Sequence, residues 1–474
     1  MLSLAHLITA LTQIGAEGID RPIPEVVVDS RQAIPGALFV ALPGEKVDGH
    51  DYIQDAFERG AAYALVQKDF SDKYPQLDLR LDWHPENIKV LGMSPLCLRV
   101  EDSLKSFHRI ARYWREQLDV RVIGITGSVG KSTTKELIAE VLGRRYCTLK
   151  NPGNLNNEIG LPLTLLHLTA EHERAVLEMG FYVPGEIQLL CELASPSVGV
   201  VTNIGTVHAE RAGSIEEIAR GKAELVEALP PAPEGLAILN YDDPRVRQMA
   251  TRTQARVFYY GMSPEADLWA DGVEGLGLEG IHFQMHYQNE VMHLRVPLIG
   301  RHSVHTALRG ASVGLNDGLT WQEIFDGLQE SQAQLRLVTV RAKSGALILD
   351  DTYNASPEST LAALNLLDEL DGRKIAVLGD MLELGQYEQE GHELVGARAA
   401  GVVDQLVTVG ELGKKIALAA STSGLPGESI LVFENNHQAI KYLRGHLTNQ
   451  DIVLVKGSRG MRMDVIVSAL ETHT

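Results

Sequence analysis

Residues 120–143 read VRVIGITGSVGKSTTKELIAEVLG, and this stretch decides the fold of the middle of the chain. It opens with an apolar, β-branched run, which predicts a buried strand. Gly127 and Gly130 follow, and apolar residues then recur at helical spacing from residue 137 to residue 142. A strand, a glycine-rich turn and a helix in this order predict a phosphate-binding loop.

The residue types of this turn suit a nucleoside triphosphate. Glycines allow backbone N–H groups to turn toward phosphate oxygens at the positive end of a helix. Lys131 can reach the outer phosphates, and the Ser132 hydroxyl can hold Mg²⁺. The longer motif G-x-x-x-x-G-K-[ST] would need a glycine at Ile125, so only the shorter G-x-x-G-K-S-T core is present. A strand–helix turn without a ligand is the alternative. The expected nucleotide-binding residues are Gly127, Ser128, Val129, Gly130, Lys131, Ser132 and Thr133.

Composition limits the class of protein. The chain has 474 residues, which predicts two to three domains. With 43 basic and 62 acidic residues its formal net charge is −19, which argues against general binding of nucleic acid or of an anionic membrane. The three cysteines lack C-x-x-C spacing, and no apolar run reaches membrane-spanning length. We therefore expect a cytoplasmic protein with reduced thiols and no membrane insertion.

The pattern of apolar runs and turns predicts an α/β protein with three domains. Residues 1–102 form an N-terminal α/β domain, in which the irregular stretch 71–99 is expected to include a surface excursion. Residues 103–333 form a central P-loop domain with a parallel sheet and a β-rich extension at 267–299. Residues 334–474 repeat strand then helix, which predicts a Rossmann-like doubly wound domain.

Three side chains of the central domain are candidate site residues, two of them after predicted strands and one in a predicted helix. Glu178 ends the strand predicted at 175–179, where a carboxylate can hold Mg²⁺ or simply be a surface charge. His208 follows the strand predicted at 198–204 and is either structural or a ligand of metal or phosphate. Lys222 lies in the helix predicted at 215–228, where a lysine is ordinarily solvated.

Further polar clusters stand in loops. Asn156 and Asn157 lie in an amide-rich loop that could contact a polar substrate or be a plain turn. Tyr353 and Asn354 follow a double aspartate at a predicted strand exit. The loop after the last predicted strand contains KGSR at 456–459, which could receive a carboxylate.

Together these stretches resemble the Mur ligase family over nearly the whole chain. The motifs are DSR at 29–31, GEKVDGH at 44–50, TGSVGKSTTKE at 126–136, NNEIGLP at 156–162, EMG at 178–180, NIGTVH at 203–208, DDTYNASP at 350–357, LGDMLELG at 378–385 and KGSR at 456–459. Among the sister ligases, the resemblance favours the one that adds D-alanyl-D-alanine to UDP-N-acetylmuramoyl-tripeptide.

The resemblance implies specific roles, and it makes residues 1–102 the substrate domain. Lys131, Glu178, His208 and Lys222 would be the catalytic residues. Two Mg²⁺ ions would be bound by Ser132, Glu178, His208 and a carbamylated Lys222. His302, Arg336 and Asp351 would also bind ATP. The substrate-binding residues would be Ser30, Arg31, Asp48, Gly49, His50, Asn156, Asn157, Tyr353, Asn354, Lys456, Ser458 and Arg459.

One segment departs from the family pattern. The family's G-x-H-N-x-x-N-A segment, whose polar residues line the adenine pocket, appears here as GRHSVHTA at 300–307. Ser303 and Thr306 replace both asparagines, so each position loses part of its hydrogen-bonding capacity. We expect this change to affect adenine recognition rather than phosphate chemistry.

The expected activity is formation of a peptide bond through an acyl phosphate. The tripeptide carboxylate attacks the γ-phosphate of ATP, and the amine of D-alanyl-D-alanine then displaces phosphate. We expect a monomer whose partners are these small molecules and not nucleic acid. The alternatives are another Mur-type or folylpolyglutamate-type amide ligase, or a degenerate P-loop module that binds nucleotide without catalysis. Diaminopimelate and lysine both remain open as the third residue of the tripeptide.

Overall fold

The computed structural model describes residues 1–15, 21–44, 46–80, 93–330 and 338–471. The chain forms two compact units. The first comprises Met1–Ile123, Tyr146–Gly180 and Gln188–Pro196, and the second comprises Gly124–Arg145, Phe181–Ile187 and Ser197–Thr474. Among the described residues, three separate sheets of five, nine and six strands give the mixed α/β architecture that the sequence predicts. The domain boundaries at 102/103 and 333/334 stay predictions.

The first sheet has five parallel strands in the order β1-β2-β3-β5-β4. Helices α1 and α4 cover it, and Leu7, Phe107 and Ile110 are fully buried in its core. Asp102 caps the start of α4, where its side chain accepts a hydrogen bond from the N–H of Lys105. The elements are α1 (Leu4–Thr12), β1 (Val26–Val27), β2 (Leu38–Val40), α2 (Ile53–Glu58), β3 (Tyr63–Val66), β4 (Gln76–Asp78), β5 (Leu96–Arg99) and α4 (Ser103–Glu116).

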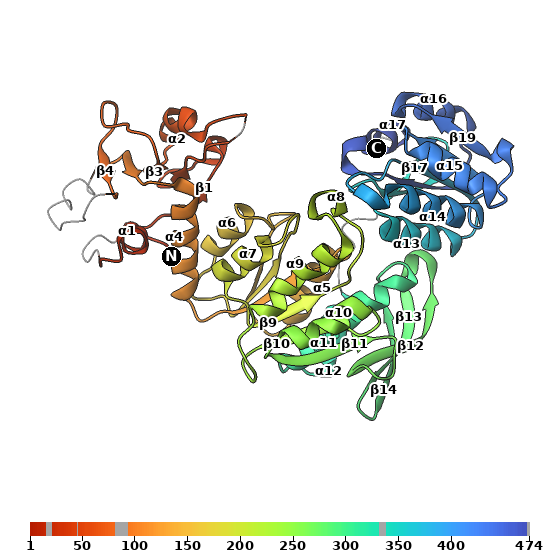
Figure 1. Cartoon of the computed structure of the whole chain (residues 1–474), viewed down its shortest axis with the longest axis horizontal. Helices are drawn as coiled ribbons and strands as arrows, with labels where there is room; N and C mark the ends of the chain where they lie inside the picture. Colours follow the sequence, from red (N-terminus) through yellow and green to blue (C-terminus); the bar gives the residue numbers. More distant parts are fainter. Residues whose placement is uncertain (16–20, 45, 81–92, 331–337, 472–474) are drawn as a thin grey trace. The chain divides into compact units, whose positions relative to one another are not determined.

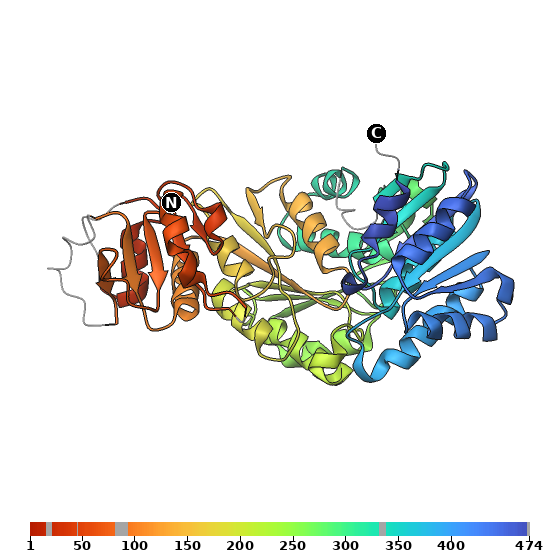
Figure 2. The same cartoon turned by 90° about the horizontal axis from the view of Figure 1, so that it is seen from above.

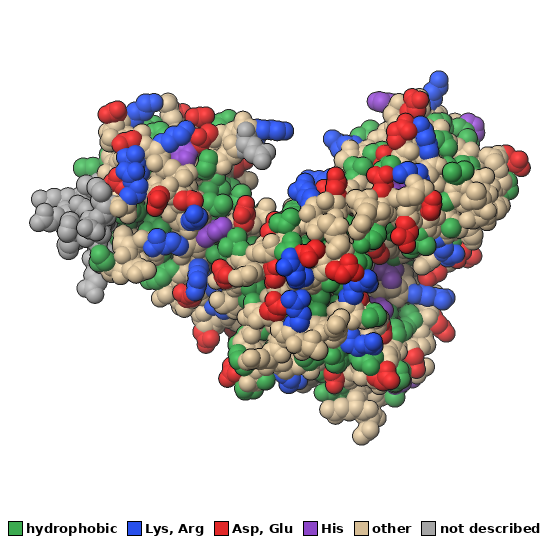
Figure 3. Space-filling model, viewed as in Figure 1, with side chains coloured by type: hydrophobic (Ala, Val, Ile, Leu, Met, Phe, Trp, Pro, Cys, Tyr) green, Lys and Arg blue, Asp and Glu red, His purple; other side chains and the backbone are tan. Residues whose placement is uncertain are grey.

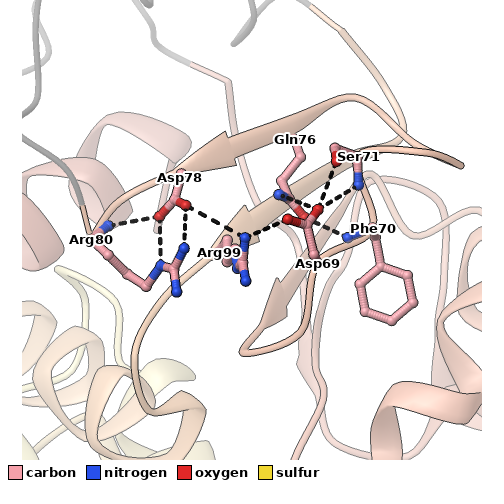
Figure 4. A network of polar contacts seen from close by, with 7 residues as sticks. All are labelled: Asp69, Phe70, Ser71, Gln76, Asp78, Arg80 and Arg99. Atoms are coloured by element: carbon pink, nitrogen blue, oxygen red, sulfur yellow. Dashed lines mark hydrogen bonds and ion pairs between the residues drawn. The ribbon is translucent and has the colours of Figure 1, made fainter.

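The expectation that residues 71–99 are irregular is wrong for two segments, because β4 and β5 belong to this sheet. Figure 4 shows the polar network that stabilises the edge of the sheet formed by β4. Arg99 donates to Asp69 at 2.6 Å and lies 3.7 Å from the carboxylate of Asp78. Asp69 also accepts hydrogen bonds from Ser71 and Gln76. The rest of the stretch, 81–92, lies outside the described residues.

The second sheet contains nine strands in the order β14-β13-β12-β11-β10-β9-β6-β8-β7. The strands from β9 to β12 are parallel, and β12, β13 and β14 form the expected β-rich extension as an antiparallel meander. Strand β9 ends at Val201 rather than at residue 204, since the next side chains bond to the phosphate loop.

The strands of this region are β6 (Arg121–Thr126), β7 (Thr148–Lys150), β8 (Arg174–Glu178), β9 (Val198–Val201), β10 (Leu236–Asn240), β11 (Arg256–Gly261), β12 (Leu268–Gly275), β13 (Ile281–Tyr287) and β14 (Glu290–Val296). The helices are α5 (Lys131–Leu142), α6 (Gly160–Leu166), α7 (Glu186–Ala194), α8 (Ala209–Ala212), α9 (Ile215–Glu227), α10 (Pro244–Gln248), α11 (Val304–Asn316) and α12 (Trp321–Gln329).

The third sheet has the order β15-β16-β20-β17-β18-β19 and is parallel except for β15. One apolar core contains residues of α13, α14 and α15, and the other contains residues of α16 and α17, so helices cover both faces (Figures 1 and 2). This is the predicted doubly wound arrangement. The elements are β15 (Val338–Arg341), β16 (Leu347–Asp351), α13 (Pro357–Asp368), β17 (Arg373–Gly379), α14 (Glu388–Ala400), β18 (Gln405–Val409), α15 (Gly413–Thr422), β19 (Ile430–Phe433), α16 (Asn436–His446), β20 (Asp451–Lys456) and α17 (Asp464–Leu470).

The surface mixes charges of both signs. On the face drawn in Figure 3, acidic and basic side chains alternate over short distances instead of gathering by sign. Within the described residues, no helix combines the length and apolarity that crossing a bilayer requires.

Candidate active site

The phosphate loop connects β6 to α5. Gly127 has φ +143° and Gly130 has φ +84°, which are conformations that favour glycine. A Cβ atom on Gly127 would lie 1.8 Å from Oγ1 of Thr202, so the loop and the end of β9 approach too closely for any side chain. Helix α5 begins at Lys131, and its first N–H groups have no acceptor within the helix, which suits an anion at this end.

The middle of the loop is attached to the segment after β9. Asn203 accepts from the N–H of Val129 at 2.9 Å and donates to the carbonyl of Val129 at 3.2 Å. The N–H of Ser128 donates to the carbonyl of Asn203 at 2.9 Å. The amides of Ser128 and Val129 thus have protein acceptors, and the amides from Gly130 onward are the better candidates for phosphate.

Two lysines converge on one carbonyl of the loop. Lys131 Nζ lies 2.8 Å from Gly127 O, and Lys222 Nζ lies 3.0 Å from the same oxygen. Lys222 is buried on α9, and its ammonium position lies 4.7 Å from the ring centroid of Phe181. Burial, and next the charge of Lys131, lower the pKa of Lys222 well below 10.5. The expectation of an ordinary solvated lysine is wrong, and the catalytic role that the family resemblance implies for Lys222 stays a prediction.

His208 immediately precedes α8 and has φ +66°. Its Nδ1 lies 2.7 Å from Oε2 of Glu383, and the ring packs edge-on against Tyr182. Burial lowers the pKa of His208 from 6.5, Glu383 opposes that shift, and Lys131 and Lys222 add to it. If Nδ1 carries the proton toward Glu383, Nε2 is the nitrogen available to a ligand.

Glu178 ends β8 and is buried with 2% exposure. Its carboxylate accepts from the side-chain amide of Asn156 at 2.8 Å, and its backbone N–H donates to Asn151 at 2.9 Å. Asn157 instead accepts from the N–H groups of Ile159 and Gly160 at the start of α6. Asn156 therefore orients the candidate metal-binding carboxylate, whereas Asn157 shapes the loop.

A pocket adjoins the phosphate loop within the second unit. It brings together residues of the loop, of the segment before α11, and of the strand ends β16 and β20. The predicted site residues that line it are Ser128, Val129, Gly130, Thr133, His302, Asp351, Tyr353, Asn354 and Lys456. Ser303 and Thr306, the positions that depart from the family pattern, line it as well.

Lys456 links the two strand ends of this pocket. Its buried Nζ donates to Oδ2 of Asp351 at 2.6 Å and to the carbonyl of Asn354 at 2.9 Å. Ser458 is buried and accepts from the N–H of Leu382, so its hydroxyl has a structural contact. Arg459 is exposed in the following turn. Arg336 lies outside the described residues.

A second pocket lies in the first unit and includes the predicted substrate residues Ser30, Arg31 and Gly49. Arg31 makes an ion pair with Asp29 at 2.6 Å at the rim of this pocket. His50 is buried, with Nδ1 2.6 Å from Asp48 and Nε2 accepting from the N–H of Gln67. Lys68, through a hydrogen bond to Asp48, holds the pKa of that carboxyl well below its usual range. Asp48 and His50 thus support the loop that carries Gly49.

The comparisons with known proteins agree with this arrangement. The description "Mur ligase middle domain" matches residues 125–314, "Mur ligase, glutamate ligase domain" matches residues 335–459, and "Mur ligase family, catalytic domain" matches residues 22–89. A UDP-N-acetylmuramoyl-tripeptide–D-alanyl-D-alanine ligase of Bacillus subtilis is 35% identical over 94% of this chain and 92% of its own length.

The chain belongs to the Mur ligase family.

Solved Mur ligases share the whole fold. The structure of MurF from Acinetobacter baumannii aligns over 99% of this chain and 98% of its own, with a TM-score of 0.84 at 29% identity. MurF ligase from Thermotoga maritima in complex with ADP aligns over 94% of this chain and 96% of its own, with a TM-score of 0.77 at 27% identity. The three-domain Mur ligase fold expected from the sequence is confirmed.

Sequence reasoning missed several residues of this Mur ligase site. Asn203 stood in a quoted motif, but only the structure shows that it clamps the loop. Glu358 accepts from the N–H of Thr206 at 3.0 Å, and Glu383 contacts His208. Both glutamates are 150 or more positions from their partners in sequence, so no local pattern could reveal them. A lone arginine within the apolar run ALRGA at 307–311 was a visible signal that was overlooked.

Proposed function

We propose that this protein uses ATP to join D-alanyl-D-alanine to UDP-N-acetylmuramoyl-tripeptide, which gives UDP-N-acetylmuramoyl-pentapeptide. The observation that supports this most is the pocket that unites the phosphate loop with Asp351, Tyr353 and Asn354 of the last domain. A nucleotide bound there would have its phosphates on the loop and its nucleoside against the polar strand ends. The cytoplasmic location and a monomeric state are parts of this proposal.

The proposed reaction has two steps. A carboxylate oxygen of the tripeptide attacks the γ-phosphorus of ATP, the bond from that phosphorus to the β–γ bridging oxygen breaks, and ADP leaves. The amine of D-alanyl-D-alanine then attacks the acyl carbon, loses a proton, and phosphate leaves as the amide forms. Lys131 Nζ, at the start of α5, would balance negative charge that develops on the transferred phosphoryl group.

The donor set suits magnesium. Ser132 presents a hydroxyl at the start of α5, and Glu178 presents a buried carboxylate, so both offer the oxygen ligands that Mg²⁺ prefers. No group of three or more His, Cys, Asp or Glu side chains converges among the described residues, so phosphate oxygens of ATP would be needed as further ligands of an ion held by Ser132 or by Glu178. A bound Mg²⁺ would neutralise charge between the triphosphate and the attacking carboxylate.

Lys222 is proposed to act as a carbamate. A neutral amine adds to CO₂ and releases one proton, and the lowered pKa of this buried lysine favours the neutral form. The product is an anion, which could accompany a second cation where an ammonium group could not. His208 would face the same region through Nε2, with Glu383 holding Nδ1.

The activity is tested by phosphate release from the purified protein. We expect release from ATP and Mg²⁺ only when both UDP-N-acetylmuramoyl-tripeptide and D-alanyl-D-alanine are present, with the pentapeptide as the product seen by mass spectrometry. Diaminopimelate-containing and lysine-containing tripeptides are assayed in parallel. Release that required neither substrate, or only one, would refute the proposal.

The rival proposals predict other outcomes. A sister Mur ligase or a folylpolyglutamate-type ligase would turn over with a single amino acid in place of D-alanyl-D-alanine. A degenerate nucleotide-binding module would bind ATP without turnover of any substrate in the panel. The altered segment at 300–307 is the feature that favours such a module, whereas retention of Lys131, Glu178, His208 and Lys222 favours catalysis.

A further inference from the structure

Helix α11 carries an arginine in its buried interior. Arg309 is 4% exposed although it lies among small and apolar neighbours. Its guanidinium donates from Nη2 to the hydroxyl of Thr306 at 2.8 Å and from Nη1 to the hydroxyl of Tyr260 at 3.4 Å. It also lies 5.7 Å from the centroid of the Tyr260 ring. The groups that hold this cation are therefore neutral.

No carboxylate lies within ion-pair distance of Arg309 in the described part of the chain. In addition, its Nε is buried and has no hydrogen-bond partner there. Moving a charge out of water is expensive unless an opposite charge accompanies it, and arginine keeps its proton in proteins. The fold therefore holds a buried positive charge that forms no ion pair with an acidic side chain of the described residues.

The position of this charge indicates what neutralises it. The Nη2 atom lies 3.4 Å from the point where a Cβ on Gly130 would stand, so the guanidinium packs directly against the phosphate loop. Its hydrogen-bond partner Thr306 lines the same pocket as Gly130 and Thr133. A nucleotide on this loop would bring several negative charges close in space to Arg309.

We propose that Arg309 is a phosphate-recognition residue of this ligase, a buried counter-charge that is neutralised when the nucleotide binds. The inference rests on the proposed nucleotide site and assigns it one further residue. Arg309 acts through space and through its packing against Gly130, so it is a positioning and electrostatic residue and not a catalytic one.

The test compares ligands that differ only in phosphate number. Binding of adenosine, AMP and ADP is measured by calorimetry on the unchanged 474-residue chain and on Arg309→Met. We expect affinity for ADP to fall by about tenfold or more, since one unit charge several ångströms away contributes that much at an effective dielectric constant of about 20. The loss should be smaller for AMP, and adenosine should bind within about twofold of the unchanged protein.

Thermal unfolding supplies a second readout. Because the substitution removes an unneutralised buried charge, ligand-free Arg309→Met should have a Tm equal to or above that of the unchanged protein. Saturating ADP should raise that Tm less than it raises the Tm of the unchanged protein. A purely structural arginine would give the opposite result, with a lower ligand-free Tm and equal losses for adenosine and ADP.

Two further variants make the test specific. Arg309→Lys keeps the charge and should retain most of the affinity for ADP. This variant still tests the inference if Arg309→Met does not fold. Arg247→Met is the matched control, because Arg247 also packs over a tyrosine, Tyr241 at 4.7 Å, but is exposed, whereas Arg309 is buried against Gly130 of the phosphate loop. It should leave the affinity for ADP unchanged.

The outcomes separate this inference from the proposed function. If the unchanged protein binds ADP and Arg309→Met binds it equally well, or if the loss is the same for adenosine, the inference is overturned and the nucleotide site stands. If the unchanged protein does not bind ADP at all, the proposed function fails and the inference fails with it.

Discussion

At the scale of single residues, Lys222 shows how strongly the surrounding fold can change the solvent exposure and the pKa of a side chain. Its helix is amphipathic, and by sequence alone the lysine could as well face water. The structure places it instead beside Gly127 and the ring of Phe181, with 1% exposure. Lys222 stands three or four positions from the buried Ile218, Leu225 and Val226, so helical spacing places it on their apolar face, and only the preference of lysine for water argued against its burial.

The lowered pKa of Lys222 predicts a pH dependence of stability. Between its folded-state pKa and 10.5, the unfolded chain holds a proton that the folded chain lacks, so the free energy of unfolding rises with pH in that window. Lys222→Met removes this contribution and should stabilise the ligand-free protein near neutral pH. The difference between the two proteins should shrink as pH rises, by up to about 1.4 kcal/mol per pH unit.

Urea unfolding from pH 7 to 10 in CO₂-free buffer measures both curves. Parallel curves would mean that the lysine is protonated in the folded state. The same variant should lose ligase activity, and added bicarbonate should not restore it.

At the scale of elements, the predictions succeeded where burial on both sides makes a strand continuously apolar. The strand predicted at 175–179 is β8 (Arg174–Glu178), which differs by one residue at each end. The predictions failed where a strand is short and the residues around it in sequence are polar or proline-rich, as in β4 and β5. They also missed β15, an antiparallel edge strand, because an edge strand leaves no distinctive pattern.

The phosphate loop yields a prediction about shape. Gly127→Ala places a methyl group 1.8 Å from Oγ1 of Thr202 and also forces φ +143° on a residue with a side chain. Gly424→Ala is the matched control, since Gly424 has φ +103° and open space around it. The control should cost about 1–2 kcal/mol of stability from backbone strain alone. Gly127→Ala should cost more and should abolish ADP binding, because Lys131 and Lys222 both donate to the Gly127 carbonyl.

Chemical unfolding and ADP titration of the two variants measure these effects. Equal stability losses in the two variants, or undiminished ADP binding by Gly127→Ala, would contradict the geometry.

At the scale of the whole molecule, the chain has several cores rather than one. The first sheet is packed around Leu7, Phe107 and their neighbours, and the third sheet has a core on each face. Chain length and composition correctly predicted more than one hydrophobic core. The contacts that assemble the nucleotide pocket could not be predicted in the same way, because Asp351 and Lys456 are 105 positions apart and meet only through the strand order β16-β20.

Two compact units with separate cores predict unfolding in more than one step. The nucleotide pocket consists of residues of the second unit, so a bound nucleotide should stabilise that unit in particular. Differential scanning calorimetry should resolve at least two transitions, of which ADP raises one by several degrees. A single transition, or equal shifts of all transitions with ADP, would contradict this expectation.

The clamp of Asn203 on Val129 has a consequence for the energetics of binding. Its amide meets the peptide group of Val129 with one donated and one accepted hydrogen bond, as a neighbouring strand would. The middle of the loop is thus ordered before any nucleotide arrives, and the conformational entropy lost in ordering it belongs to folding. Nucleotide binding then requires no rearrangement of this part of the loop. Most of the interaction energy therefore contributes to affinity.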